Sequence, residues 1–173
     1  MEFRDPAVLL DYLASTHART RRLIPLIPAA DLEWAPKPGA FTFGDTVRHL
    51  AAIERWMYGE TVAGRPSAYR GCGRDLADGP AAVLALYDRW HEDARAIFAS
   101  LTPERLAGRS TTPGGTSITT WKWLRAMFEH EAHHRGQLYL MLALRGVPTP
   151  PIYGLTSEEV AARGVATPPE RER

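Results

Sequence analysis

The sequence predicts an all-α protein built as a four-helix bundle. Four segments repeat apolar residues at the helical period of 3.6, and none shows the two-residue alternation of a half-buried strand. Clusters of Pro and Gly separate these segments. Four amphipathic helices joined by loops of about 15–20 residues favour a bundle. The chain has 173 residues, 45% of them hydrophobic and 24% charged, which suits one globular domain.

The first helix is expected over about residues 5–26. Asp5 is suited to cap its first turn, and Pro6 fits the first helical position. Pro25 and Pro28 end the helix because proline lacks the backbone N–H that a helix interior needs. The inner face is expected to hold Leu9, Tyr12, Leu13, Thr16, Thr20, Leu23, Ile24 and Ile27.

The second helix is expected to begin near Asp45, with Thr42 or Gly44 as its cap, and to continue to Tyr58. Its inner stripe consists of His49, Ala52, Ile53 and Trp56. Residues 59–79 contain five glycines and are expected to form a long loop.

This loop carries three arginines and the only cysteine of the chain. Arg65, Arg70 and Arg74 are interpreted as solvated, with contact to an anionic ligand as the alternative. Cys72 lies between two glycines and is interpreted as an incidental loop residue, with a catalytic thiol as the alternative. One cysteine cannot form an intramolecular disulfide.

The third helix is expected to open at residues 78–80 and to end at residues 102–104. Its buried face holds Val83, Leu86, Tyr87, Trp90, Ala94, Ile97, Phe98 and Leu101. The fourth helix runs from Ser117 or Thr119 to Leu144, where an Arg-Gly-Val-Pro sequence is a strong stop.

The sequence divides into a bundle domain and a tail. The bundle is expected over residues 1–148, and the tail, residues 149–173, is rich in Pro and expected to be partly disordered. A short helix is expected over residues 157–163, and the last residues are expected to be disordered.

Charge and hydropathy limit the classes of partner. The net charge is +1 without a dense Lys/Arg cluster, which argues against nucleic acid as a partner. The charged N-terminal residues lack a signal peptide core, and no apolar run approaches the length of a membrane span. The expected location is the cytoplasm, with no membrane association.

Three histidines carry the main functional indication. His130 and His134 are four residues apart, so they lie one turn apart on one helical face with apolar neighbours. His49 lies on the inner stripe of the second helix. Neutral imidazoles on facing helices could hold one transition metal and leave a coordination position open. The alternative is a set of hydrogen-bonded core histidines without a metal.

The other histidines and a neighbouring glutamate are interpreted differently. His133 is expected at the edge of the inner face, where it could support the metal ligands from behind. His17 and His91 are expected on helix flanks, facing solvent or a subunit contact. The stretch from His130 to His134 also fits H-E-x-x-H, which would make Glu131 a general base of a metalloprotease. No downstream third ligand fits that pattern, so this interpretation is disfavoured.

Two parts of the chain together resemble the DinB/YfiT-like family. These are the Gly-Asp-Thr-Val-Arg-His-Leu sequence around His49 and the His130-x-x-x-His134-Arg-Gly-Gln sequence. The resemblance extends from the first helix to about Gly146. It implies a four-helix bundle in up-down-down-up order and a divalent metal held by His49, His130 and His134. It also implies a homodimer.

The resemblance leaves the reaction open. Some relatives resemble thiol-dependent transferases or isomerases, which implies a low-molecular-weight thiol as a possible cofactor beside Zn, Ni, Fe or Mn. The leading hypothesis is a metal-dependent transferase or hydrolase acting on a small molecule, its catalytic residues unknown. The alternative is a non-catalytic dimeric binding or stress-response module whose metal is structural or absent.

Three further residues are candidates for the surroundings of the metal. Gln137 is expected to orient a ligand or line a polar pocket. Asp45, one turn before His49, is the nearest acidic candidate for a base. Trp56 could line an apolar pocket over the metal together with Tyr12, Trp90 and Trp123, and plain core packing is the alternative for these aromatics.

Overall fold

The computed structural model describes residues 2–164, and it confirms the all-α class. Four long helical stretches dominate this part of the chain. They are α1 (Pro6–Arg21), the continuous run of α2 (Phe43–Ile53), the π-helix η3 (Glu54–Gly59) and α3 (Glu60–Val62), then α4 (Pro80–Ala99) and α6 (Thr120–Leu144). Shorter elements are η1 (Ile24–Leu26), η2 (Ala29–Asp31), α5 (Pro103–Ala107), β1 (Arg109–Thr111), β2 (Ser117–Thr119) and α7 (Ser157–Gly164).

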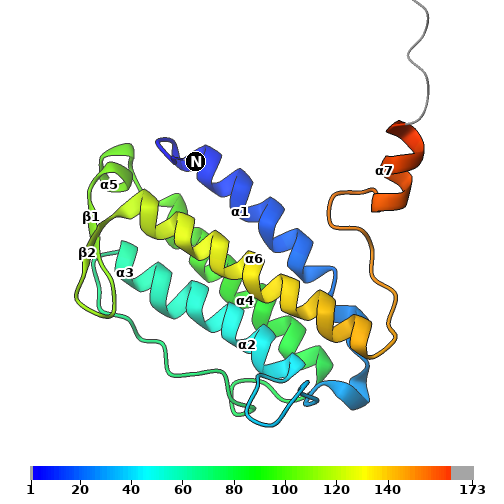
Figure 1. Cartoon of the computed structure of the whole chain (residues 1–173). Helices are drawn as coiled ribbons and strands as arrows, with labels where there is room; N and C mark the ends of the chain where they lie inside the picture. Colours follow the sequence, from blue (N-terminus) through cyan, green and yellow to red (C-terminus); the bar gives the residue numbers. More distant parts are fainter. Residues whose placement is uncertain (1, 165–173) are drawn as a thin grey trace, which may run out of the picture.

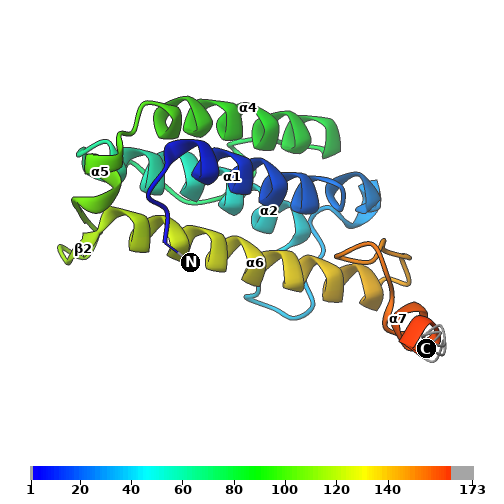
Figure 2. The same ribbon diagram turned by 90° about the horizontal axis from the view of Figure 1, so that it is seen from above.

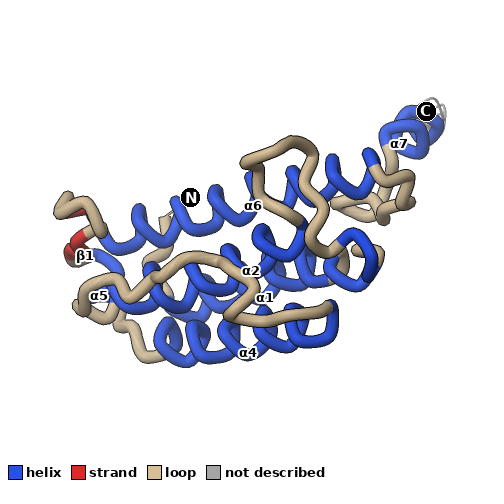
Figure 3. Tube along the Cα trace, turned by 90° about the horizontal axis from the view of Figure 1, so that it is seen from below, coloured by secondary structure: helices blue, strands red, loops and turns tan. Residues whose placement is uncertain are grey.

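The long helices pack side by side in two directions (Figures 1 and 2). Helices α1 and α6 run one way, and α2 and α4 run the other way, which is the up-down-down-up order. Both α1 and α2 contact α4 and α6. Because α2 and α4 are parallel, residues 63–79 must return along the whole bundle, and Figure 3 shows this loop crossing its outer face.

The first helix is shorter than predicted. The Asp5 carboxylate accepts a hydrogen bond from Ala7 N at 2.8 Å, as a helix cap does. However, α1 ends at Arg21, and Ile24–Leu26 form the separate 3-10 turn η1 with Pro25 in its first turn. Proline disfavours the α conformation of the residue before it, so the helix stops a few residues ahead of Pro25.

The second helix begins earlier and ends later than predicted. Thr42 is the cap: its Oγ1 accepts from Asp45 N at 2.9 Å, and the Asp45 carboxylate accepts from Thr42 N at 3.1 Å. The helix continues to Val62, beyond the expected end at Tyr58. Gly59 lies inside this helical run, and a Cβ there would lie 3.3 Å from Ile97 Cδ1 on α4. This glycine permits close helix packing and does not mark a loop.

The segment before the last helix contains structure that the sequence did not reveal. Thr102 caps the short helix α5, and β1 pairs with β2 in an antiparallel hairpin in which Ser110 lies opposite Ile118. Strands of three residues are too short to show an alternating pattern. Both α4 and α6 keep the limits expected for them within a few residues.

A layer of polar side chains separates two apolar clusters in the bundle. One cluster lies towards the first connection and includes Leu23, Val47, Leu50, Val83, Leu138 and Leu142; the other lies towards the hairpin and includes Leu9, Leu13, Ala94, Phe98, Leu124 and Met127. Between them along the four helices are the buried Thr16, Thr20, Glu54, His91, Glu131 and Arg135. We call these six residues the polar layer.

The start of the tail is fixed to the bundle. The Arg22 guanidinium donates to the carbonyls of Pro151 and Ile152 at 2.8 and 2.9 Å, and Tyr139 OH donates to Pro150 O at 3.0 Å. Helix α7 stands apart from the long helices (Figure 1). The expected disorder of the last residues falls outside the described part of the chain. Among the helices of residues 2–164, none is both long and apolar enough to cross a membrane.

Candidate metal centre

Three histidines from two neighbouring helices converge beside the polar layer. His49 comes from α2, and His130 and His134 come from successive turns of α6, which packs against α2. His130 Nε2 lies 3.0 Å from His49 Nε2 and 3.1 Å from His134 Nε2. Ligand atoms of all three rings lie within 4.8 Å of one another, and they form the one such group among the described residues.

The opposite ring nitrogens of His49 and His134 are held by hydrogen bonds. His134 Nδ1 lies 2.7 Å from Gln137 Oε1, and His49 Nδ1 lies 2.8 Å from the Tyr69 hydroxyl. An amide oxygen only accepts, so His134 carries its proton on Nδ1 and its neutral ring directs a lone pair from Nε2. A donated Nδ1–H to Tyr69 has the same effect on His49. Metal-binding histidines are commonly oriented in this way.

The three Nε2 atoms meet at a position where either a proton or a metal ion would join them. A proton on His130 Nε2 can be donated to only one neighbour at a time, whereas a metal ion can accept all three lone pairs. The Nε2 separations are also near those of nitrogens that share one ion at about 2.0–2.1 Å. The donor set therefore fits a divalent metal that prefers nitrogen ligands.

The rings are neutral at physiological pH. Burial, with the neighbouring histidines as the next cause, lowers the pKa of His49 and of His130 to about 4. Burial also lowers the pKa of His134, and the bond to Gln137 opposes that shift. Neutral imidazole is the form that binds a metal.

Gln137 and His133 lie behind this group, on the exposed side of α6. Gln137 bridges two histidines: its Oε1 accepts from His134, and its Nε2 lies 3.1 Å from His133 Nε2. His133 is exposed and is not among the three converging rings.

Neither candidate carboxylate joins the histidines. Asp45 caps α2 and pairs with Arg48 Nη1 at 3.0 Å. Glu131 points into the bundle, where its Oε1 accepts from Thr20 Oγ1 at 2.6 Å and from Tyr87 OH at 3.1 Å. The H-E-x-x-H interpretation fails on this placement, because its general base would have to face the metal.

His17 and His91 are not on the outer flanks, which corrects the sequence prediction. His91 is 4% exposed, and its Nδ1 lies 3.0 Å from Glu54 Oε1. The ring of His17 stacks on that of His91, with centroids 3.5 Å apart, and on Tyr87. The helical period places His91 near a boundary, and only the packing of a buried Glu54 opposite it draws the ring inward.

The aromatic residues expected around the metal separate into different regions. Tyr12 packs on Phe128, and Trp123 donates to Thr61 Oγ1 at 2.9 Å; both belong to the cluster near the hairpin. Trp56 and Trp90 line a cavity between α2 and α4.

A different cavity adjoins the histidines. It has about 390 Å³, and its lining includes His134, Gln137, Phe41, Lys37, Leu140 and Leu144. The Phe41 ring lies 5.2 Å from His49 and 6.2 Å from His134 between centroids. Phe41 and Tyr69 are in loops, where no periodic pattern shows which side chains turn inward, so sequence reasoning missed them.

Arg48, next to His49, is a further residue whose role the sequence did not reveal. Its side chain is fully buried and pairs with Glu33 and Asp45. It also donates to Ala77 O at 2.9 Å and to Cys72 O at 3.5 Å. It therefore joins α2 to both flanking connections, and its place in the motif around His49 is structural.

Comparisons with known proteins agree with this architecture. The model of the DinB superfamily matches residues 12–138. A crystal structure of a DinB-like protein from Bacillus subtilis is 18% identical, with a TM-score of 0.67, covering 86% of this chain and 99% of that one. Another, from Bacillus cereus, is 16% identical with a TM-score of 0.69, covering 83% and 94%. At such identities the likeness is one of fold. No curated protein matches the chain.

Proposed function

This chain belongs to the DinB superfamily, and from that premise we propose that it is a metal-dependent enzyme acting on a small molecule, of the thiol-dependent transferase or hydrolase type. The observation that carries the proposal is the convergence of three neutral imidazoles through their Nε2 atoms, with the Nδ1 atoms of His49 and His134 hydrogen-bonded on the far side. His49, His130 and His134 would hold the ion, with Zn, Ni, Fe and Mn as the candidates.

Three protein ligands leave a coordination position free for a substrate or water, as in catalytic rather than structural sites. An ion held there supplies a Lewis acid able to polarise a carbonyl, to acidify a water or to bind a thiolate. The protein's part is to hold the rings: Gln137 and Tyr69 fix His134 and His49 so that their lone pairs need no reorientation.

The cavity beside His134 supplies a place for the substrate. Phe41, Leu140 and Leu144 give it apolar walls beside the histidines. Lys37 is the cationic residue of its lining, so it favours an apolar substrate with an anionic group, or a thiolate, at the cavity mouth.

A specific observation supports the second candidate, a non-catalytic dimeric binding module. Leu140 and Leu144 are 61% and 58% exposed on the face of α6 that lines this cavity, and a second copy of the chain could cover them. In addition, neither Asp45 nor Glu131 is free to act as a general base.

Elemental analysis of protein purified without a His-tag or a chelating column tests the metal centre. We expect about one metal per chain in the wild type and none in the His130→Ala/His134→Ala double variant. His133→Ala is the matched control: it removes a histidine from the same turn that is not one of the three ligands, so it should keep its metal. Full occupancy in the double variant would overturn the site.

Spectroscopy of Co- or Ni-loaded protein then separates the two functions. An exchangeable water on the ion supports an enzyme, and it justifies screening thiol transfer and hydrolysis with each candidate metal. A saturated coordination sphere, or no metal in the wild type after reconstitution, would overturn the enzyme proposal in favour of the binding module.

A further inference from the structure

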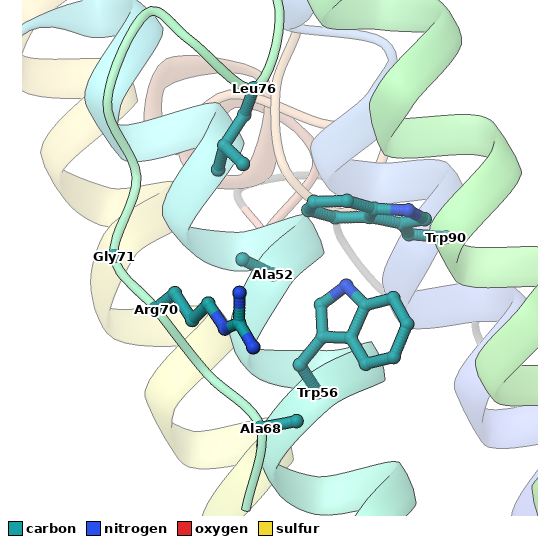
Figure 4. Close-up of a pocket in the computed structure, with 7 residues that line it drawn as sticks. All are labelled: Ala52, Trp56, Ala68, Arg70, Gly71, Leu76 and Trp90. Atoms are coloured by element: carbon teal, nitrogen blue, oxygen red, sulfur yellow. The ribbon is translucent and has the colours of Figure 1, made fainter.

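A second cavity, of about 330 Å³, lies between the α2–η3 stretch and α4, and residues of the loop 63–79, which we call the crossover loop, line one side of it. Its lining is apolar apart from one charge: it consists of Ala52, Trp56, Ala68, Arg70, Gly71, Leu76 and Trp90. Figure 4 shows the Arg70 side chain reaching from the loop across the cavity towards the indole of Trp56. The two indole rings meet edge to face, with centroids 5.9 Å apart.

The π-helix η3 builds this cavity. A wider helical turn leaves a carbonyl without its usual partner in the helix. The carbonyl of Trp56 accepts from Ala68 N at 2.8 Å, which fastens the loop to the helix beside the cavity. Ser67 Oγ lies 3.4 Å from the same carbonyl. These bonds fix the loop beside the helix, with the Arg70 side chain directed towards Trp56 (Figure 4). Single π-turns in helices frequently occur at functional sites.

Arg70 differs from the other arginines around it. Arg65 pairs with Glu60, and Arg74 pairs with Asp78 at 2.9 Å. Arg55, whose guanidinium lies 4.1 Å from the Trp56 ring centroid, also pairs with Glu60. Within residues 2–164, Arg70 has neither an ion pair nor a hydrogen bond, and the lining of its cavity contains no carboxylate. Its donors are free for an external anion.

We propose that this cavity binds a small aromatic carboxylate. The flat body of the ligand would lie against Trp56 and Trp90, and its carboxylate would pair with the Arg70 guanidinium, whose planar fork matches two carboxylate oxygens. The volume is within the range of small-molecule sites. Arg65, Arg70 and Arg74 are all exposed, as the sequence predicted, and the proposal gives Arg70 the anionic ligand that was the alternative.

This site is separate from the histidines and stands whether or not they support a reaction. The two are physically adjacent through one loop, because Tyr69, which holds His49 Nδ1, is the neighbour of Arg70 in the chain.

The test is titration of the full-length protein with phenylacetate and with its neutral isostere phenylacetamide, followed by two-dimensional NMR of the indole N–H groups. The chain has five tryptophans, so each resonance can be assigned from a Trp→Phe variant. We expect the resonances of Trp56 and Trp90 to move, and phenylacetate to bind at least tenfold more tightly than the amide. Equal affinities, or shifts confined to other tryptophans, would overturn the proposal.

Matched variants identify the cationic partner. In Arg70→Gln the preference for the acid should fall to about one, whereas in Arg74→Gln, from the same loop, it should remain. Ala68→Leu narrows the cavity and should weaken both ligands. If Arg74→Gln lost as much of the preference for the acid as Arg70→Gln, the preference would come from the overall positive charge of the loop. That result would overturn the assignment of Arg70 as the partner of the carboxylate.

The His130→Ala/His134→Ala variant separates this proposal from the metal centre. Its affinity for phenylacetate should stay within twofold of the wild type although its metal is lost. Disappearance of binding in that variant would place the carboxylate on the metal and overturn the second site.

Discussion

Gln137 connects two histidines with opposite surroundings, one buried in the converging group and one exposed. Its amide oxygen accepts from His134 Nδ1 and so fixes which nitrogen of that ring is free. Its amide nitrogen lies near the exposed His133, a contact with solvent access that the bond to His134 does not require. The orientation of the His134 ring thus depends on Gln137, an uncharged residue that is not itself a candidate metal ligand.

We expect Gln137→Ala to weaken metal binding about 10- to 100-fold, because His134 loses the acceptor that orients it. Gln137→Glu keeps an acceptor at the same position and should bind metal at least as well as the wild type. Competition with a chromophoric chelator measures both affinities. His133→Ala is the control and should lie near the wild type; equal affinity in Gln137→Ala and the wild type would contradict the role.

At the scale of single residues, helical periodicity predicted which side chains of the regular helices face the interior. His49, His130 and His134 were placed together because an apolar face of a helix has a known direction. Tyr69 and Phe41 could not be predicted, since a loop has no repeating geometry. His91 was misplaced because its burial depends on Glu54, a charged residue that sequence reasoning assigns to the surface.

Among the elements, the π-helix η3 and the short α3 after it are joined to the following loop by the ion pairs of one carboxylate, that of Glu60. Glu60 pairs with Arg65 and Arg55, and hydrogen bonding to Arg65, then to Arg55, lowers the pKa of Glu60 to about 2 against the opposing effect of burial. Its folded pKa is thus below its unfolded value. The pairing therefore stabilises the fold above about pH 4.5, and this contribution is lost as the pH falls towards 2.

Glu60→Gln should lower the free energy of unfolding at pH 7 by about 1–3 kcal/mol, since one pKa unit corresponds to about 1.4 kcal/mol. The difference from the wild type should shrink between about pH 5 and pH 2. Urea unfolding across that range measures it. Glu92→Gln, which removes an exposed pair with Arg95, is the control and should change little. A difference that is independent of pH would contradict this account.

Element boundaries were less predictable than elements. Pro25 marks a stop, yet the helix ends several residues before it, because the restriction acts on preceding residues as well. Gly59 signals a loop in sequence, but the approach of Ile97 explains it. A glycine required by a neighbouring helix and a glycine required by a turn look the same in one sequence.

For the whole molecule, Arg48 joins parts that are distant in the chain. Its buried guanidinium meets Glu33 from the first connection and the Cys72 and Ala77 carbonyls from the crossover loop. A parallel pair of helices such as α2 and α4 needs that loop to lie along the bundle. Nothing in the spacing of Arg48 predicted this role, because its partners are in irregular segments.

Arg48→Met should destabilise the fold by about 3–5 kcal/mol, because it leaves carboxylates and carbonyls near the interior without their donor. Arg48→Lys should recover less than half of this loss, since an ammonium cannot reach partners on several sides as the guanidinium does. Urea unfolding measures both variants. Arg95→Met, from an exposed pair, should stay within about 0.5 kcal/mol of the wild type. A loss below 1 kcal/mol in Arg48→Met would contradict the role.

The polar layer has a consequence for the alignment of the helices. Two apolar clusters, rich in Leu on several helices, would tolerate one helix sliding past its neighbours by a turn, about 5.4 Å. Such a slip would move Glu54 or Glu131 away from its partner and against Leu or Phe, at a cost of several kcal/mol. The layer thus fixes the axial alignment of all four helices. It disfavours packings in which one helix is shifted along its axis. It therefore keeps His49 on α2 at the same axial level as His130 and His134 on α6.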